Sequence, residues 1–178
     1  MNCNRCPFAV LNNFKTVKPR GDITKKLFII GEAPGHKEQR TGIAFVGKAG
    51  QHLQWFINNN GLRKVAYFTN ALKCRPPKNR TPEMREIMIC RPRLISEITE
   101  GKPKIIILLG NTAVNAFFGK EINSITKLKD KHLFTNGTII LFNYHPSYIL
   151  RNNELIDDYD RFFTKVRVLY KYFVNKYI

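Results

Sequence analysis

Four short apolar runs constrain the fold of this chain more than any other feature of its sequence. They are KLFIIG (26–31), VAYFTN (65–70), KIIILLG (104–110) and TIILFN (138–143). Each run is too short and too uniformly apolar for a strand with one wet face, so each is predicted to be a strand covered on both faces. About 30 residues separate consecutive runs, which is enough for the right-handed crossovers that join parallel strands. The sequence therefore predicts an α/β three-layer sandwich, with a central, mainly parallel four-stranded sheet flanked by helices.

Helical signals occupy the segments between these runs and the end of the chain. A helix is predicted in KAGQHLQWFINNNG (48–61), because its apolar residues fall on one helical face. Thr81 before Pro82 predicts the start of another helix, which Pro92 should kink or restart. A long amphipathic helix is predicted at the end of the chain from the stripe Ile156, Tyr159, Phe163, Val166, Tyr170, Phe173 and Tyr177.

A polar or glycine-rich motif follows each predicted strand. These motifs are GEAPG, TNALKC, LGNTA and NYHPS. Ligands of open α/β sheets bind at the carboxyl ends of the strands, so the four motifs are predicted to meet at one edge. Glu32, Asn70 and His145 should therefore build one pocket, although 113 positions separate the first from the last.

Each pocket candidate also has an ordinary interpretation. Glu32 is consistent with a helix cap or with a partner for a surface lysine. Phe45, in a glycine-flanked loop, is either a core anchor or a platform on which a planar ligand stacks. Asn70 can simply end its strand, although its amide could also read a pyrimidine edge. The surrounding segment 31–50 matches neither a Walker A loop nor the dinucleotide-binding fingerprint.

The charge of the chain favours a polyanionic partner. Lys and Arg number 30 against 13 Asp and Glu, which gives a formal net charge of +17. Such an excess favours nucleic acid, with a membrane surface or the ribosome as the competing partners. The basic residues are spread along the chain, so composition does not locate the binding surface.

Length and hydropathy limit the organisation and location of the chain. Its 178 residues are enough for one domain with a sizeable core, so residues 1–178 are predicted to form a single domain. No stretch approaches the roughly 20 apolar residues that span a bilayer. The N-terminal segment lacks the apolar core of a signal peptide, which predicts an intracellular location and no membrane partner.

The cysteines are Cys3, Cys6, Cys74 and Cys90. In a reducing compartment they are better metal ligands than disulfide partners, and the first two form a CxxC pair. Together they would make a four-thiolate site for structural zinc or for an iron–sulfur cluster, and their spacing does not choose between these. Unpaired buried thiols are the alternative.

A basic loop begins beside one of these cysteines, in KCRPPKNRTP (73–82). Lys73, Arg75, Lys78 and Arg80 would hold positive charge in fixed positions on this proline-stiffened segment, as phosphate binding requires. A solvated loop is the alternative.

Taken together, these motifs resemble the family 4 uracil-DNA glycosylases, the iron–sulfur members of the uracil-glycosylase superfamily. The resemblance runs from Cys3 to Arg151 and rests on GEAPG with Glu38, GIAFVGKAG, TNALKCRPPKNRTP, Cys90 with RPRL, and HPSYILR. Two positions depart from the family pattern: Gln39 replaces an Asp, and KLKDK stands where an Arg-Gly pair is common.

The resemblance implies a role for each pocket residue. Glu32 would position or activate the attacking water, and His145 would donate a hydrogen bond to uracil O2. Phe45 would stack on the extruded base, and Asn70 would bind its Watson–Crick edge. Glu38 would lie against uracil C5, where the methyl group of thymine would clash.

The resemblance also implies how cofactor and DNA are bound. The four cysteines would hold a structural 4Fe-4S cluster. Ser147 would bind a phosphate and Arg151 the backbone, while Leu150, together with Ile149, would wedge into the vacated base stack. The partner would be uracil-containing DNA, single- or double-stranded, and the protein would act as a monomer.

Two other functions are compatible with parts of this pattern. One is a non-catalytic DNA-binding protein that uses the same fold. The other is a zinc-stabilised hydrolase of free nucleotides, which the charge of +17 disfavours because a small substrate needs no broad basic surface.

Overall fold

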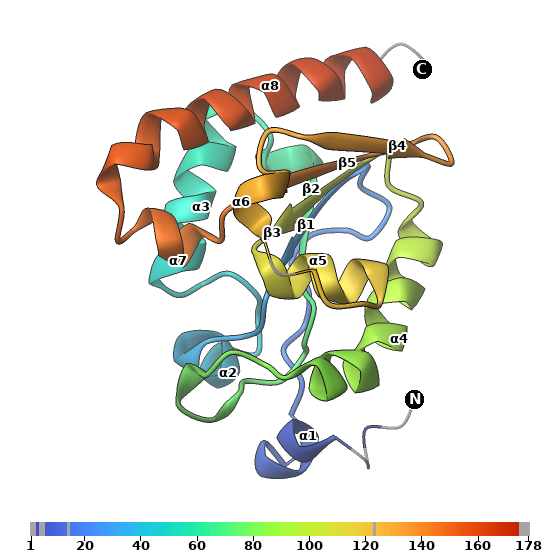
Figure 1. Cartoon of the computed structure of the whole chain (residues 1–178), viewed down its shortest axis with the longest axis vertical. Coiled ribbons are helices and arrows are strands. Elements are labelled where there is room, and N and C mark those ends of the chain that lie inside the picture. The colour runs from blue at the N-terminus through green and yellow to red at the C-terminus, as the bar shows by residue number, and fades with distance from the viewer. Residues whose placement is uncertain (1–2, 4–5, 14, 123, 175–178) are drawn as a thin grey trace.

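A mixed sheet forms the centre of the molecule (Figure 1). The computed structural model describes residues 3, 6–13, 15–122 and 124–174, and within these residues the sheet has five strands in the order β2-β1-β3-β5-β4. The strands are β1 (Leu27–Gly31), β2 (Ala66–Asn70), β3 (Ile105–Leu109), β4 (His132–Thr135) and β5 (Thr138–Asn143). All neighbouring pairs are parallel except β4 and β5. The predicted α/β fold with a mainly parallel sheet is confirmed.

The strand count differs from the prediction because of β4. Every residue of this edge strand is exposed, so HLFT carries none of the uniform apolar character that marks the other four. The strand follows from its hairpin with β5, in which Thr135 pairs with Thr138 across Asn136 and Gly137. Both turn residues have positive φ angles, as a two-residue hairpin turn requires.

Helices cover both faces of the sheet (Figure 1). The α-helices are α1 (Pro7–Leu11), α2 (His36–Thr41), α3 (Lys48–Asn59), α4 (Met84–Gly101), α5 (Asn111–Phe118), α6 (Ile125–Leu128), α7 (Pro146–Ile149) and α8 (Ile156–Val174). Short 3₁₀ helices are η2 (Arg63–Val65), η3 (Pro77–Asn79) and η4 (Asn153–Leu155). Helices α3 and α8 pack on one face, and α1, α4 and α5 pack on the other. Successive residues of β1 alternate between the two resulting cores, which is why the strand is apolar throughout.

Helix α4 begins later than predicted and is continuous through its one proline. Its N-cap is Glu83, not Thr81, and the Glu83 backbone N–H donates to the Glu86 carboxylate at 2.7 Å in a capping box. The helix continues through Pro92, so of the two predicted outcomes, a kink or a restart, the restart is wrong. Buried side chains on either side of the proline, Ile87 and Leu94, hold both halves of the helix against the same core.

Helix α8 confirms the predicted C-terminal amphipathic helix as far as Val174, and Tyr177 lies outside the described residues. Its buried side chains Tyr159, Phe163 and Val166 pack against α3 and the sheet. Among the described residues, no helix is both long enough and apolar enough to cross a membrane.

Replacing Phe163 with alanine should lower the free energy of unfolding by about 3–5 kcal/mol, because its fully buried ring leaves a cavity between α8, α3 and the sheet. Denaturant unfolding followed by circular dichroism measures the change. Val168→Ala on the same helix is the matched control, since Val168 is 61% exposed and its truncation should stay within about 0.5 kcal/mol. Equal losses in the two variants would contradict this packing.

Candidate active site

The predicted pocket residues surround one cavity at the carboxyl edge of the sheet. The cavity has a volume of about 920 Å³, and its walls include Glu32, Glu38, Phe45, Asn70 and His145. Gly31 and Asn70 are register partners on β1 and β2, and β5 ends on the same side two residues before His145. The structure thus brings together side chains that are up to 113 positions apart in the sequence.

Phe45 and Asn70 can lie close together because Gly31 and Gly50 carry no side chains. A Cβ atom on Gly31 would lie 2.6 Å from both Asn70 Oδ1 and Phe45 Cζ. A Cβ atom on Gly50 would lie 2.3 Å from the backbone of Phe45, which adopts a left-handed φ of 57°. The Phe45 ring is buried 5.9 Å from that of Phe68, so it is a core anchor as well as a cavity wall. Within the described part of the chain, the Asn70 amide has no hydrogen-bond partner and is available to a ligand.

Thr112 fixes the Glu32 carboxylate, and the sequence did not single it out. The Thr112 hydroxyl, in the first turn of α5, donates to Glu32 Oε2 at 2.7 Å. Burial raises the pKa of Glu32, and the hydrogen bond from Thr112 partly opposes that rise by stabilising the carboxylate. In the described residues Glu32 neither caps a helix nor pairs with a lysine. The position of Thr112 directly after a strand, in LGNTA, is the signal that could have revealed it.

Glu38 is held against backbone at another wall of the cavity. This buried carboxylate, on α2, accepts a hydrogen bond from the Gly47 backbone N–H at 2.7 Å. A Cβ atom at Gly35 or at Gly47 would come within 2.9 Å of a Glu38 carboxylate oxygen. Because Gly35 and Gly47 carry no side chains, their backbone can lie directly against the Glu38 carboxylate and fix its position.

His145 is held as a neutral imidazole. Burial, with a smaller contribution from the positive charge of Arg151, lowers the pKa of His145 to about 4. The Ser147 backbone N–H donates to His145 Nδ1 at 3.3 Å, and the Ser147 hydroxyl lies 2.8 Å from the same nitrogen. A backbone N–H can only donate, so Nδ1 is the acceptor and the ring proton lies on Nε2. At neutral pH the ring is therefore an uncharged hydrogen-bond donor.

The predicted phosphate-binding residues divide into two groups. Arg80, Ser147 and Arg151 border the cavity, whereas Arg75 and Lys78 lie on the loop outside its walls. Arg80 donates to both carboxylate oxygens of Glu86, at 2.9 and 2.6 Å, so much of its charge is already compensated.

Of the two residues predicted to act as a wedge, only Leu150 is exposed. Leu150 is 42% exposed, while Ile149 is fully buried in the core beneath α7. The expectation that Ile149 joins the wedge is wrong, because α7 turns consecutive side chains in different directions.

Lys73 differs from the other basic residues of its loop because it is only 4% exposed. Its ammonium donates to Glu97 Oε2 at 2.8 Å, to Thr69 Oγ1 at 2.6 Å and to the Asn70 carbonyl at 2.9 Å. The prediction that Lys73 offers charge to phosphate is therefore wrong. Its ammonium instead ties the end of β2 to helix α4.

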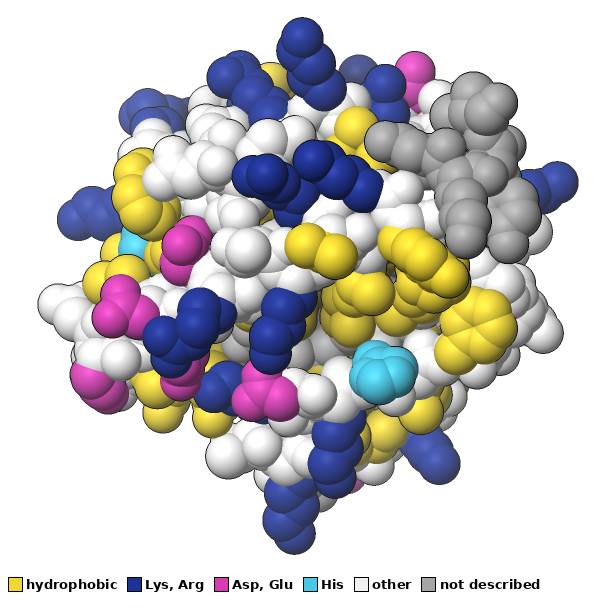
Figure 2. Space-filling model, turned by 90° about the horizontal axis from the view of Figure 1, so that it is seen from above, with side chains coloured by type: hydrophobic (Ala, Val, Ile, Leu, Met, Phe, Trp, Pro, Cys, Tyr) yellow, Lys and Arg dark blue, Asp and Glu magenta, His cyan; other side chains and the backbone are white. Residues whose placement is uncertain are grey.

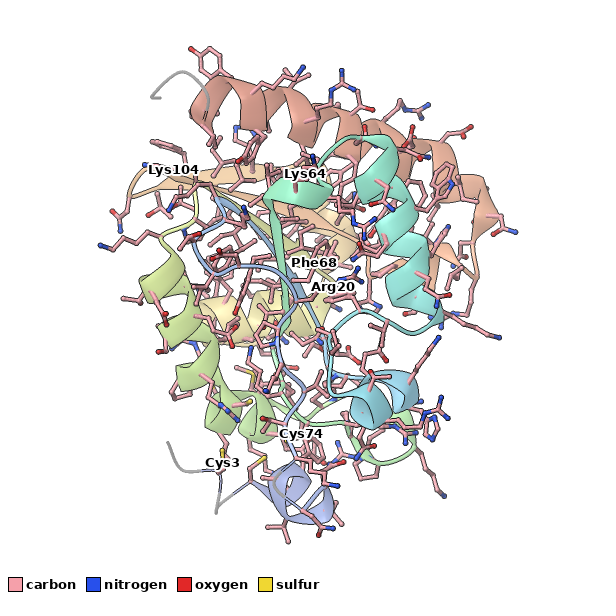
Figure 3. The ribbon with its side chains drawn as sticks, turned by 180° about the vertical axis from the view of Figure 1, so that it is seen from behind. Cys3, Arg20, Lys64, Phe68, Cys74 and Lys104 are labelled. Carbon is pink, nitrogen blue, oxygen red and sulfur yellow. The ribbon has the colours of Figure 1, made fainter. Side chains whose placement is uncertain are left out.

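A second cavity, of about 280 Å³, is bordered by Cys3, Cys6, Cys74 and Cys90. Figure 3 shows Cys3 and Cys74 near the end of the molecule that carries α1. Burial and the neighbouring thiols raise the pKa of Cys74 to about 11 and also raise that of Cys90. Four thiolates are therefore costly here unless a positively charged centre lies between them.

The cysteines are not grouped as the ligands of one ion would be. Zinc holds each thiolate sulfur about 2.3 Å away, which sets its ligands close together. Among the described residues, no three metal-ligating side chains are grouped tightly enough for one ion. The donor set is nevertheless all thiolate and surrounds a single space.

Comparison with known proteins shows the family to which the chain belongs. The profile of the Uracil DNA glycosylase superfamily matches residues 18–168, so the chain belongs to that superfamily. A Type-4 uracil-DNA glycosylase of Thermotoga maritima is 38% identical over 157 residues, which cover 86% of this chain and 81% of the relative. One from Sulfurisphaera tokodaii is 37% identical over 180 residues, covering 95% and 80%. One from Pyrobaculum aerophilum is 35% identical over 170 residues, covering 90% and 85%.

Replacing Thr112 with valine should raise the pKa of Glu32 further, because the valine cannot donate to the ionised carboxylate. Carboxyl ¹³C chemical shifts followed through a pH titration measure this change. Thr112→Ser keeps the hydroxyl and is the matched control, with a titration close to that of the unchanged protein. A Thr112→Val titration that moves to lower pH would show that the hydroxyl does not stabilise the carboxylate.

Proposed function

We propose that this chain is a uracil-DNA glycosylase, which flips uracil out of DNA and hydrolyses the bond between uracil N1 and the sugar C1′, initiating base-excision repair. The observation that carries the proposal is the single cavity bordered by Glu32, Phe45, Asn70 and His145. One carboxylate, one ring, one amide and one imidazole are what this hydrolysis requires. Membership of the superfamily and the similarity to Type-4 uracil-DNA glycosylases support the same function.

His145 would stabilise the leaving group. Uracil departs as an anion whose charge is shared with O2, so a donor aimed at O2 lowers the barrier. Because Ser147 holds Nδ1 as the acceptor, the Nε2 proton is available for this hydrogen bond. A neutral donor also loses less hydration in a buried site than a cation would. Such oxyanion-hole donors contribute about 3–4 kcal/mol to transition-state stabilisation.

Glu32 would act on the opposite side of the breaking bond. The sugar becomes cation-like as uracil leaves, and a carboxylate stabilises that charge and orients the attacking water. The hydrogen bond from Thr112 stabilises the ionised form of Glu32 against its burial, and it engages only Oε2, so the other carboxylate oxygen would bind the water.

Three side chains would select the base. Phe45 would stack on the extruded ring, and the unpartnered Asn70 amide would bind its Watson–Crick edge. Glu38, fixed by the Gly47 N–H, would close the space beside C5 and exclude thymine.

DNA binding would combine a broad basic surface with a few residues at the mouth of the cavity. Figure 2 shows Lys and Arg side chains spread over the face of the molecule that it presents, in keeping with the net charge of +17. Ser147 and Arg151 would bind phosphates beside the uracil, and Arg75, Lys78 and Arg80 would do so from the loop. Leu150 would fill the space left in a duplex, and uracil-containing single or double strands would both be substrates for a monomer.

The four cysteines would hold a 4Fe-4S cluster. The all-thiolate donor set suits iron–sulfur ligation, and a cluster accommodates sulfur atoms that are spaced more widely than around one ion. Arg93 Nη1 lies 3.7 Å from Cys3 Sγ and would share in balancing the thiolate charge. The cluster would neutralise the thiolates and join α1, the basic loop and α4.

A labelled oligonucleotide with one uracil, followed by alkali to cleave abasic sites, tests the proposed activity. His145→Ala should lower the excision rate by about 10²–10³-fold, because the donor to O2 is lost, while DNA affinity stays nearly unchanged. His132→Ala is the matched control, since this exposed histidine lies on the edge strand β4 and does not border the cavity. Excision by the His145 variant at the normal rate, or none by the unchanged protein, would refute the assignment.

Purified protein should be brown and contain about four irons and four acid-labile sulfides per chain, with broad visible absorbance from sulfur-to-iron charge transfer. Cys90→Ser should lose most of this absorbance and unfold at a lower temperature, because the link between the basic loop and α4 is broken. Metal analysis and thermal denaturation measure both effects. Colourless protein that contains stoichiometric zinc would contradict the cluster and indicate a zinc site instead.

A further inference from the structure

Two tyrosines form a stacked pair on the wall of the catalytic cavity. The rings of Tyr144 and Tyr148 have centroids 4.8 Å apart and planes 35° from parallel, and both residues border the cavity. Tyr148 is nevertheless 41% exposed, so its pairing with Tyr144 leaves a large part of its surface accessible to a ligand. None of the roles described above uses this tyrosine pair.

Tyr144 gives the pair a rigid base. Its carbonyl accepts a hydrogen bond from the buried Tyr159 hydroxyl at 3.2 Å, which joins it to α8. The ammonium of Lys129 lies 5.7 Å from the centre of the Tyr144 ring, and Lys129 is itself held by Asp158 at 3.5 Å. A side chain supported in this way presents its neighbour Tyr148 in a fixed orientation, which limits the entropy lost when a ligand stacks on it.

The surroundings of Tyr148 favour a nucleobase as that ligand. Ser147 and Arg151, on either side of it in the sequence, border the same cavity and provide polar and cationic groups for a sugar-phosphate chain. Leu150 is exposed to a similar extent, at 42%, but an aliphatic side chain has no π face. Exposed aromatic rings beside a positively charged groove are the usual stacking platforms for single-stranded nucleic acid.

We infer that Tyr148 is a stacking platform for the base next to the extruded uracil in single-stranded DNA, with Tyr144 as its support. The inference rests on the proposed function, since it places a neighbour of the target base. In a duplex the neighbouring base is already stacked and paired, so the platform contributes less there. A platform and a wedge therefore make opposite predictions, because a wedge matters most on a duplex.

Tyr148→Leu should lower kcat/KM on a single-stranded uracil oligonucleotide by about 5- to 150-fold, the range expected from the stacking of one base. The loss on the matching duplex should be smaller. Tyr148→Phe keeps the ring and should stay within about twofold of the unchanged protein, which separates stacking from any hydrogen bond of the hydroxyl. Thermal denaturation of both variants confirms that they fold.

Substrate changes test the same contact from the DNA side. Replacing the bases beside uracil with tetrahydrofuran abasic analogues should lower kcat/KM of the unchanged protein to the level of Tyr148→Leu, and should leave that variant almost unaffected. Two results would overturn the platform. One is a drop in kcat/KM of the Tyr148→Leu variant, caused by abasic neighbours, as large as the drop in the unchanged protein. The other is a loss of kcat/KM from Tyr148→Leu that is larger on the duplex than on the single strand.

A binding measurement separates this inference from the proposed function. Fluorescence of 2-aminopurine placed beside uracil in single-stranded DNA should be quenched when the DNA binds the His145→Ala variant. The double variant, which carries both His145→Ala and Tyr148→Leu, should quench it less. Quenching that does not depend on the Tyr148 ring, with excision by the unchanged protein intact, overturns the platform alone. Absence of excision by the unchanged protein refutes the glycosylase assignment, whatever the fluorescence shows.

Discussion

The parallel register of the sheet is the constraint on which the site depends. Gly31 is paired with Asn70, and Leu109 with Asn143, so β1, β2, β3 and β5 end at the same edge. The polar side chains that follow these strands are therefore brought together by the strand pairing itself, and they need no direct contacts with one another. Gly31 adds a local condition, because any side chain there would occupy the space in which the Asn70 amide and the Phe45 ring come together.

The segment that follows β2 joins the two cavities. Asn70 faces the larger cavity and Cys74 the smaller one, only four positions later. Between them, buried Lys73 binds the Asn70 carbonyl and the Glu97 carboxylate of α4, the helix that also carries Cys90. A buried ammonium without its partner is strongly unfavourable, so this ion pair fixes the distance between β2 and α4. A group held by the cysteines would therefore stabilise the position of the amide without touching the substrate.

The sequence predicted those parts of the structure that depend on strong local patterns. Four buried strands and the common edge follow from apolar runs that end in polar motifs, whereas exposed β4 has no such pattern and forms only through its hairpin. Packing decided what the sequence could not: Ile149 is buried while Leu150 is exposed, although both are aliphatic. The hydrogen bond from Thr112 to Glu32 joins residues that are 80 positions apart in the sequence, so it becomes visible only once the strands are assembled into the sheet.

Charge is distributed so that the outside of the molecule and its cavity favour different parts of the same ligand. The surface carries the excess that gives +17, which attracts a polyanion. Within the cavity, burial moves the pKa of Glu32 upward and that of His145 downward, so the same loss of hydration disfavours both charged forms. An uncharged base can enter such a site while phosphates remain at the basic surface. In the proposed reaction, charge that develops on the base and the sugar during bond cleavage would lie beside Glu32 and His145, where water screens it least. Each interaction would then be stronger in the transition state than in the ground state.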